Sequence, residues 1–130
     1  MCRLWILAIL MVISVPDIAV GLEFGREAVS GKTTKMFSYG SWDRNCETKG
    51  GVVKLLTKPS HGTVTPRRAV VVAKFNRFNP MDHCLGRSIP VFQFLYTSAR
   101  GFHGTDTFQI ERTLWNGRRD IDTFTIEVPK

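Results

Sequence analysis

Beyond residue 22, apolar and polar residues alternate along most of the chain, with the two-residue period that is typical of half-buried β-strands. The clearest segment is TFTIEV at residues 123–128, in which Phe124, Ile126 and Val128 share one face. No segment of this part of the sequence carries the 3.6-residue apolar stripe of an amphipathic helix. We therefore expect an all-β fold with six or seven short strands. Strands are predicted at residues 33–39, 52–56, 69–75, 88–97, 107–111 and 123–128.

The longest predicted strand, residues 88–97, places Phe92, Phe94 and Tyr96 on one face. It also contains Pro90, which cannot donate a hydrogen bond within a sheet. The proline predicts an edge position or a bulge near the start of this strand.

The last two predicted strands are joined through the turn residues Asn116-Gly117. A two-residue loop there would pair Phe108 with Thr125 and turn the apolar faces of the two strands apart. We therefore expect a three-residue loop, residues 115–117, with Gly117 in the left-handed conformation. Pairing of Phe108 with Thr125 would refute this register.

Residues 1–21 are predicted to be a secretory signal peptide. Arg3 precedes an apolar run at residues 4–15, which is too short to span a bilayer as a helix but fits the core of a signal. Small residues follow at Ala19-Val20-Gly21, so we expect cleavage after Gly21 and a mature domain of residues 22–130. The alternative is an uncleaved membrane anchor. The expected location is outside the cytoplasm, in the periplasm or the extracellular space.

Export would leave two cysteines in an oxidising compartment, Cys46 and Cys84, and we expect them to form a disulfide. The bridge would close a loop of about 40 residues and contribute about 4 kcal/mol on a chain-entropy estimate. The alternatives are two buried free thiols or a zinc site, although neither cysteine belongs to a C-x-x-C sequence.

The chain has 18 Lys and Arg against 11 Asp and Glu, a formal net charge of +7. A basic exported domain is attracted to anionic surfaces such as acidic polysaccharide or lipid headgroups. The basic residues are scattered, however, with adjacent pairs only at Arg67-Arg68 and Arg118-Arg119. The charge therefore also fits plain solubility, and specific nucleic-acid binding is not expected because no basic strand carries interleaved aromatic residues.

The stretch GFHGTDTF, residues 101–108, holds His103 and Asp106 three positions apart, between and beside glycines. These two residues could belong to a catalytic or metal site, or the stretch could be a turn that starts a strand. We favour the turn, in which Asp106 accepts backbone N–H groups and Phe102 and Phe108 point into the core.

Two motifs resemble those of the bacterial Ig-like and cadherin-like domains of secreted and surface proteins. The first is PSHGTV at residues 59–64, and the second is YTSARGFHGTDTF at residues 96–108, with Ser98 where a proline is usual. The resemblance implies an Ig-like antiparallel β-sandwich of about seven strands, in a small secreted variety with one disulfide. It also implies that the motif residues shape turns and have no catalytic role. These residues are His61, Gly62, Gly101, Phe102, Gly104, Thr105, Asp106 and Phe108.

An antibody-type domain is disfavoured, because its cysteines lie on the second and sixth strands with a Trp between them, whereas Trp42 precedes both cysteines here.

The ring of His61 is expected to bond a neighbouring backbone group. Tyr39 and Trp42 are expected in the core or over the disulfide.

Residues for catalysis are sparse. The chain lacks G-x-S-x-G, H-E-x-x-H and S-x-x-K sequences, and His83 with Asp82 offers only a pair of zinc ligands. Asp120 and Asp122 are the closest acidic pair for calcium, but they alternate with Ile121 as strand residues do. We expect no enzymatic activity, no metal and no cofactor.

The hairpin tip with Trp115, Arg118 and Arg119 is the candidate binding patch, since an aromatic ring beside guanidinium groups suits sugars, phosphates or a protein. The alternative is that Trp115 folds back over the end of the sandwich and the arginines are merely solvated. The expected function is an exported, non-enzymatic binding or structural module of the bacterial cell envelope, with a protein or an anionic envelope component as its partner. The alternatives are a secreted hydrolase inhibitor that acts through residues 115–119 and, less favoured, a metal-dependent enzyme.

Overall fold

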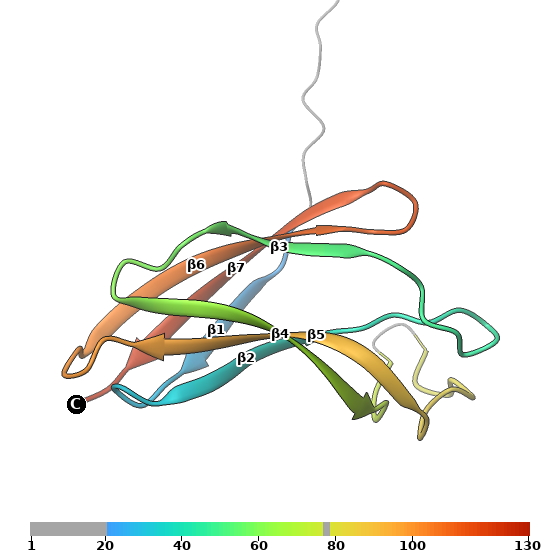
Figure 1. Cartoon of the computed structure of the whole chain (residues 1–130), viewed down its shortest axis with the longest axis horizontal. Helices are drawn as coiled ribbons and strands as arrows, with labels where there is room; N and C mark the ends of the chain where they lie inside the picture. Colours follow the sequence, from blue (N-terminus) through green and yellow to red (C-terminus); the bar gives the residue numbers. More distant parts are fainter. Residues whose placement is uncertain (1–20, 77–78) are drawn as a thin grey trace, which may run out of the picture.

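The computed structural model describes residues 21–76 and 79–130, and within these ranges the chain is all-β, with no helix. The predicted signal peptide lies almost wholly outside the described residues. Within the described part, no helix is long and apolar enough to cross a membrane. Seven strands are present (Figure 1): β1 Glu23–Glu27, β2 Thr33–Tyr39, β3 Val52–Thr57, β4 Gly62–Val72, β5 Ser88–Ser98, β6 Gly104–Thr113 and β7 Arg119–Val128.

The strands form two sheets that face each other as a β-sandwich, with the order β1-β7-β6-β3 in one and β2-β5-β4 in the other. Neighbouring strands are antiparallel except for β1, which runs parallel to β7 at the sheet edge. The expected all-β sandwich of about seven strands is confirmed, and β1, which the apolar pattern did not predict, adds the one parallel pairing of the described strands. The sequence of β1 is EFGRE, whose single large apolar side chain, Phe24, stacks on Phe124 with ring centroids 4.9 Å apart.

The register predicted for the last hairpin is confirmed. Phe108 pairs with Phe124, and Thr113 pairs with Arg119, so the apolar faces of β6 and β7 coincide. The loop is closed by hydrogen bonds from Leu114 N to Arg118 O and from Gly117 N to Leu114 O, and Gly117 has a φ of 83°. This is the expected three-residue loop with its glycine in the left-handed region.

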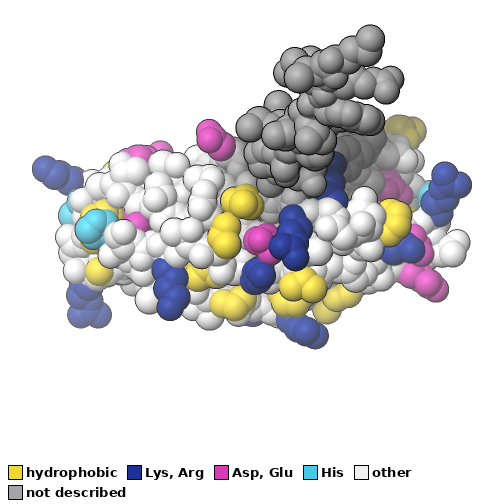
Figure 2. All heavy atoms as spheres, turned by 90° about the horizontal axis from the view of Figure 1, so that it is seen from above, with side chains coloured by type: hydrophobic (Ala, Val, Ile, Leu, Met, Phe, Trp, Pro, Cys, Tyr) yellow, Lys and Arg dark blue, Asp and Glu magenta, His cyan; other side chains and the backbone are white. Residues whose placement is uncertain are grey.

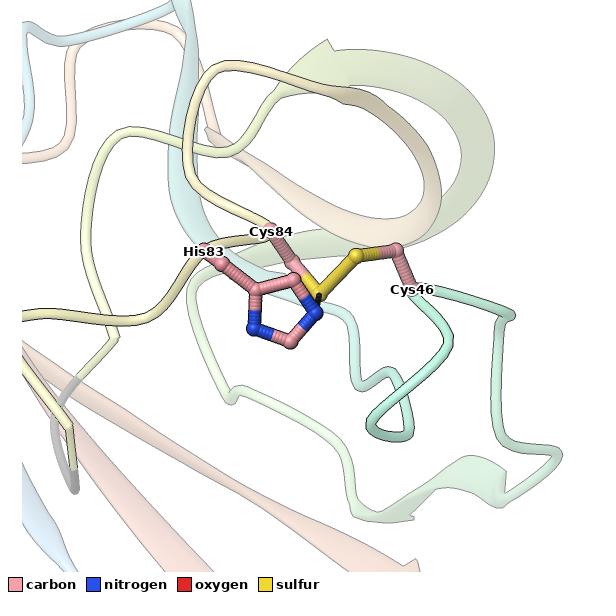
Figure 3. A group of neighbouring side chains, drawn as sticks. All are labelled: Cys46, His83 and Cys84. Carbon is pink, nitrogen blue, oxygen red and sulfur yellow. Dashed lines mark hydrogen bonds between the residues drawn. A yellow bond between two sulfur atoms is a disulfide. The ribbon is translucent and has the colours of Figure 1, made fainter.

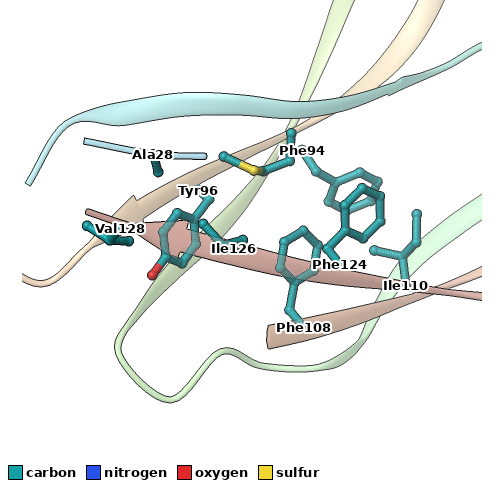
Figure 4. Packing of buried hydrophobic residues seen from close by; sticks show 9 residues of the cluster. Ala28, Phe94, Tyr96, Phe108, Ile110, Phe124, Ile126 and Val128 are labelled. Atoms are coloured by element: carbon teal, nitrogen blue, oxygen red, sulfur yellow. The ribbon is translucent and has the colours of Figure 1, made fainter. Parts of the chain in front are cut away.

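The main core lies between the two sheets and is rich in aromatic rings (Figure 4). Phe108 and Phe124 stack with centroids 4.7 Å apart, and both are fully buried. The predicted inward positions of β6 and β7 are thus confirmed. The buried members are Ala28, Met36, Phe94, Tyr96, Phe108, Ile110, Phe124, Ile126 and Val128.

A second core lies at one end of the β2-β5-β4 sheet. Phe94 and Tyr96 of β5 face the main core, whereas Ile89 and Val91 have the opposite parity and therefore point to the other face. That face is also buried, because Trp42 and Leu85 from the long connections pack against it. Of the two positions predicted for Trp42, in the core or over the disulfide, the structure shows the first.

The start of β5 also accounts for its proline. β2 pairs with β5 only from Phe92 to Thr97, so Pro90 has β4 on one side and no paired strand on the other. Pro90 is thus locally at an edge, as expected for a residue without a backbone donor. β4 begins earlier and ends earlier than the predicted strand 69–75.

Candidate functional site

The structure joins Cys46 and Cys84 in a disulfide, with Cα atoms 5.4 Å apart, as predicted (Figure 3). The connection that carries Cys46 is tightly turned: Asp43 Oδ1 accepts hydrogen bonds from the N–H groups of Asn45 and Glu47, at 2.9 and 3.0 Å. Cys46 itself has a φ of 63°, in the left-handed region. The bridge therefore holds together two loops that are otherwise separated by two strands.

Beside the bridge lies His83, whose ring Nε2 is 3.7 Å from Cys84 Sγ and 2.8 Å from the carbonyl oxygen of Arg44. Potential ligand atoms of Cys46, His83 and Cys84 lie within 4.8 Å of one another. In the disulfide the two sulfurs bond each other, and neither is the thiolate that zinc requires. The oxidised site therefore does not provide a zinc-ligand set.

Asp82 anchors Trp42 next to the bridge. Its carboxylate accepts hydrogen bonds from Trp42 Nε1 at 2.8 Å, from the N–H of Cys84 at 2.8 Å and from Asn76 Nδ2 at 2.5 Å. The bond from the Cys84 N–H is the largest cause of a lowered pKa of Asp82, followed by the bond from Asn76. Asp82 is therefore ionised at neutral pH, and its carboxylate keeps the indole of Trp42 in one orientation.

These side chains line an open hollow of about 540 Å³ at the disulfide-linked end of the sandwich. Both aromatic and charged groups border it, and the tryptophans of residues 22–130, Trp42 and Trp115, are both among them. Its lining consists of Trp42, Asp43, Arg44, Lys49, Asn76, Asn79, Asp82, His83 and Trp115. Aromatic faces together with amide, carboxylate and cationic groups can stack a ring and hydrogen-bond its polar substituents.

Trp115 is the most accessible aromatic group of this hollow, with 70% of its surface exposed. It does not fold back over the sandwich end, so that alternative is wrong. The ammonium group of Lys49 lies 5.6 Å from the centre of its ring. Trp115 therefore presents most of an indole to solvent beside a cation.

The two arginines of the predicted patch do not line the hollow. Arg118 Nε donates a 3.0 Å hydrogen bond to Asp120, which turns this guanidinium toward the sheet. Arg119 is exposed at the start of β7. The hairpin thus contributes Trp115 to the candidate site. The cations come from the loop at residues 44–49, which was not predicted to belong to the binding patch.

The GFHGTDTF stretch lies at the opposite end, and the structure makes it a turn followed by β6. Asp106 is buried and accepts hydrogen bonds from the N–H groups of Ser60 and His61, at 2.9 and 3.0 Å, and from the Tyr96 hydroxyl at 2.8 Å. Burial, and then the adjacent Asp106 carboxylate, raise the pKa of Tyr96, so its hydroxyl remains a donor. The expected role of Asp106 as a backbone acceptor is confirmed.

The histidines of the two motifs have separate surroundings. His103 Nδ1 lies 2.7 Å from the carbonyl oxygen of Pro129, away from the carboxylate of Asp106. The ring of His61 stacks on Phe102 with centroids 4.3 Å apart, where we expected a bond to a backbone group. Gly101 and Gly104 have φ values of 82° and 136°, which explains why glycine occupies these turn positions.

Asp120 and Asp122, the acidic pair considered for calcium, face inward. Asp122 is fully buried and binds Arg112 through Nε and Nη2, and Asp120 lies 3.7 Å from the same guanidinium. Burial alone would lower the pKa of Arg112, but the hydrogen bonds to Asp122 and the negative charges of both aspartates raise it. A signal for this arrangement was present in the sequence, because both aspartates share the parity of Phe124 and Ile126.

Charge on the surface is dispersed. On the face shown in Figure 2, Lys and Arg side chains are spread among acidic and apolar ones and form no continuous basic patch. The overall charge of the protein therefore does not indicate where a ligand binds. The disulfide-linked hollow is distinguished by its aromatic and polar lining.

The fold and site together define the chain as a disulfide-stapled, seven-stranded β-sandwich with an aromatic and polar hollow at one end. No protein-family model matches the chain, and no curated protein matches it at a significant level.

Proposed function

We propose that this protein is an exported, non-enzymatic Ig-like module that binds acidic polysaccharide of the bacterial cell envelope in the disulfide-linked hollow. The observation that carries the proposal is Trp115, an indole that is 70% exposed at the border of a hollow also lined by Trp42 and two basic side chains. An exposed indole at the border of a hollow offers a flat apolar face on which a sugar ring can stack.

The polar lining supports a sugar ligand with acidic groups. Arg44 and Lys49 are exposed and supply cations for carboxylate or phosphate substituents. Asn76, Asn79 and Asp82 supply amide and carboxylate groups for hydroxyls. A net charge of +7 adds long-range attraction to an anionic polymer.

The Ig-like assignment rests on the two motifs and on the roles of their residues. Asp106 ties the 59–64 turn to the start of β6, and the two sheets enclose an aromatic core between them. Such a scaffold holds its loops at the sandwich ends, where binding sites are commonly built.

The test uses the protein recovered from the exported fraction, titrated with a soluble polyuronate as the probe. Because Trp42 and Trp115 both border the hollow, intrinsic fluorescence reports binding directly. We expect Trp115→Ala and Arg44→Ala each to weaken binding about 10-fold. Arg100→Ala is the matched control, since it removes the same charge at an exposed position beside Gly101, at the other end.

Unchanged affinity of the Trp115→Ala variant would refute the site. Equal losses in Arg44→Ala and Arg100→Ala would show that the polymer responds only to net charge. A binding constant that falls steeply with salt in the wild type, and less so in Arg44→Ala, would support the ionic contact.

The exposed hairpin tip also supports a second candidate, inhibition of a hydrolase through residues 115–119. Its three-residue loop is fixed by two backbone hydrogen bonds and presents Trp115 outward, a geometry suited to insertion into a cleft. Affinity capture from an envelope extract separates the two: an inhibitor returns one stoichiometric enzyme, whereas the module proposed here returns polysaccharide.

A further inference from the structure

The backbone nitrogen of Leu22 lies beside a fully buried carboxylate. Leu22 N donates a 3.0 Å hydrogen bond to Asp122 Oδ1, and Leu22 O accepts one of 2.9 Å from the N–H of Thr123. Leu22 is therefore seated on β7 immediately before β1 begins at Glu23. Its nitrogen is aimed at the carboxylate of Asp122, which is shielded from water.

Shielded anions outnumber shielded cations around this nitrogen. The side chains of Asp122, Asp120 and Arg112 have exposed fractions of 0%, 6% and 12%, so two anions share one shielded cation. Arg118 also bonds Asp120, at 3.0 Å, but its side chain is 57% exposed, so this cation is not shielded. A second cation next to Asp122 would neutralise the shielded group of charges.

We propose that removal of residues 1–21 supplies this cation, as the new α-ammonium group of Leu22. Water is added across the Gly21–Leu22 peptide bond: Gly21 leaves as a carboxylate with the leader, and the Leu22 nitrogen becomes an amine that takes up a proton. The neutral amide donor is thereby replaced by a charged donor to the same carboxylate oxygen. Processing and folding are linked through this ion pair.

The sequence before residue 22 and the position of the Leu22 nitrogen are independent reasons to place cleavage at the Gly21–Leu22 bond. The Ala19-Val20-Gly21 sequence predicts cleavage after Gly21, whereas the position of Leu22 N depends only on its packing against β7. A Cβ atom at Gly21 would lie 1.4 Å from the carbonyl oxygen of Ile121, so only glycine, which has no Cβ, fits immediately before Leu22.

The order of events also follows from the geometry. Leu22 is hydrogen-bonded on both its nitrogen and its oxygen, so a protease could not hold the Gly21–Leu22 bond extended in its cleft while β1 is docked. Hydrolysis therefore precedes docking of β1, and the released ammonium group favours that docking.

The test compares two forms of the domain, residues 22–130 and residues 20–130. Both contain all seven strands, but the longer form keeps an uncharged amide at Leu22. At pH 7 we expect the 22–130 form to unfold at a temperature about 5 °C higher. An α-ammonium ordinarily loses its proton near pH 8, and pairing with a carboxylate shifts that loss upward, so the difference should disappear above about pH 10.

Other titrating groups near Leu22 are present in both forms and cancel in the comparison. They are Asp120 and Asp122 of β7, Arg112 of β6, Tyr39 of β2 against Arg112, Arg118 of the hairpin and Glu23 of β1 itself.

Asp122→Asn in both forms should abolish the difference. If this variant does not fold, acylation of the α-amine provides the second measurement: in the 22–130 form it should react at least 10-fold more slowly than in the 20–130 form. Equal unfolding temperatures at pH 7, equal acylation rates, or an exported protein whose first residue is not Leu22 would each overturn the proposal. None of these measurements involves polysaccharide, so a failure of the proposed function would be seen separately.

Discussion

Replacing Asp106 by alanine tests whether the role of the GFHGTDTF stretch is to stabilise the fold. The carboxylate is 3% exposed and accepts four hydrogen bonds, of which three come from other parts of the chain: the Tyr96 hydroxyl and the N–H groups of Ser60 and His61. The substitution leaves those three donors without their acceptor. The loss falls on the turn that connects β3 to β4 and on the core residue Tyr96.

The magnitude follows from the burial of each donor. The Tyr96 hydroxyl is in the core, where loss of a charged acceptor costs about 2 kcal/mol. The two amides belong to a turn with exposed residues, where water partly replaces the carboxylate, so about 1 kcal/mol each is expected. The sum, about 4 kcal/mol, is a large share of the stability of a small domain, but it leaves the domain folded if its total is typical.

The assay is guanidinium unfolding followed by tryptophan fluorescence and by far-ultraviolet circular dichroism. Thr105→Ala is the control: the exposed neighbour bonds only the Glu127 side chain, and its loss should cost less than about 0.5 kcal/mol. In a double-mutant cycle, Tyr96→Phe should cost less in the Asp106→Ala background than in the wild type. A cost below about 1 kcal/mol for Asp106→Ala would refute the reasoning.

Three further changes test other features. Removing the bridge by Cys46→Ser with Cys84→Ser should lower the free energy of unfolding by about 4 kcal/mol, and reduction of the wild type should give the same value in guanidinium. Gly117→Ala, at a φ of 83°, should cost about 1 to 2 kcal/mol, whereas Gly50→Ala, with open space around its Cβ position, should be nearly neutral. The lowered pKa of Asp82 means that its stabilisation is present above pH 4 and is lost as pH falls through the folded value; acid titration should therefore destabilise the wild type more than Asp82→Asn.

Much of the fold could be predicted because parity is a local property of a strand. The alternation at Phe124, Ile126 and Val128 fixed which face of β7 is buried, and the same rule excluded the pairing of Phe108 with Thr125. The disulfide could be expected from the cysteine count and the predicted export, since a bridge requires only that two cysteines meet in an oxidising compartment.

The reliance on local alternation also explains why two features of the fold were not predicted. β1 was not predicted because its sequence contains one large apolar residue, and it is held by a neighbouring strand far away in the sequence. Ile89 and Val91 were not assigned to a core, because they are buried by loops that cover the outer face of β5. Neither the parallel pairing nor the covering loops leave a periodic signal in the chain.

The hollow could not be predicted as a unit, since three segments build it. Residues 42–49, residues 76 and 79–83, and Trp115 come together only in the folded protein, in which the second core and the last hairpin lie at the same end. Of its members, only Trp115 was predicted to belong to a binding patch, because an aromatic residue beside arginines at a turn is a recognisable pattern. Arg44 and Lys49 looked like ordinary surface residues in sequence.

The disulfide joins two of these three segments, and this connects stability with the proposed binding. Cys46 lies in the segment that carries Arg44 and Lys49, while Cys84 follows Asp82, which orients Trp42. Trp115 lies in the loop between β6 and β7, and the Lys49 ammonium is 5.6 Å from the centre of its ring. Reduction should therefore weaken polysaccharide binding at temperatures where the domain is still folded, whereas Asp106→Ala at the opposite end should lower stability and leave the affinity of the folded protein unchanged.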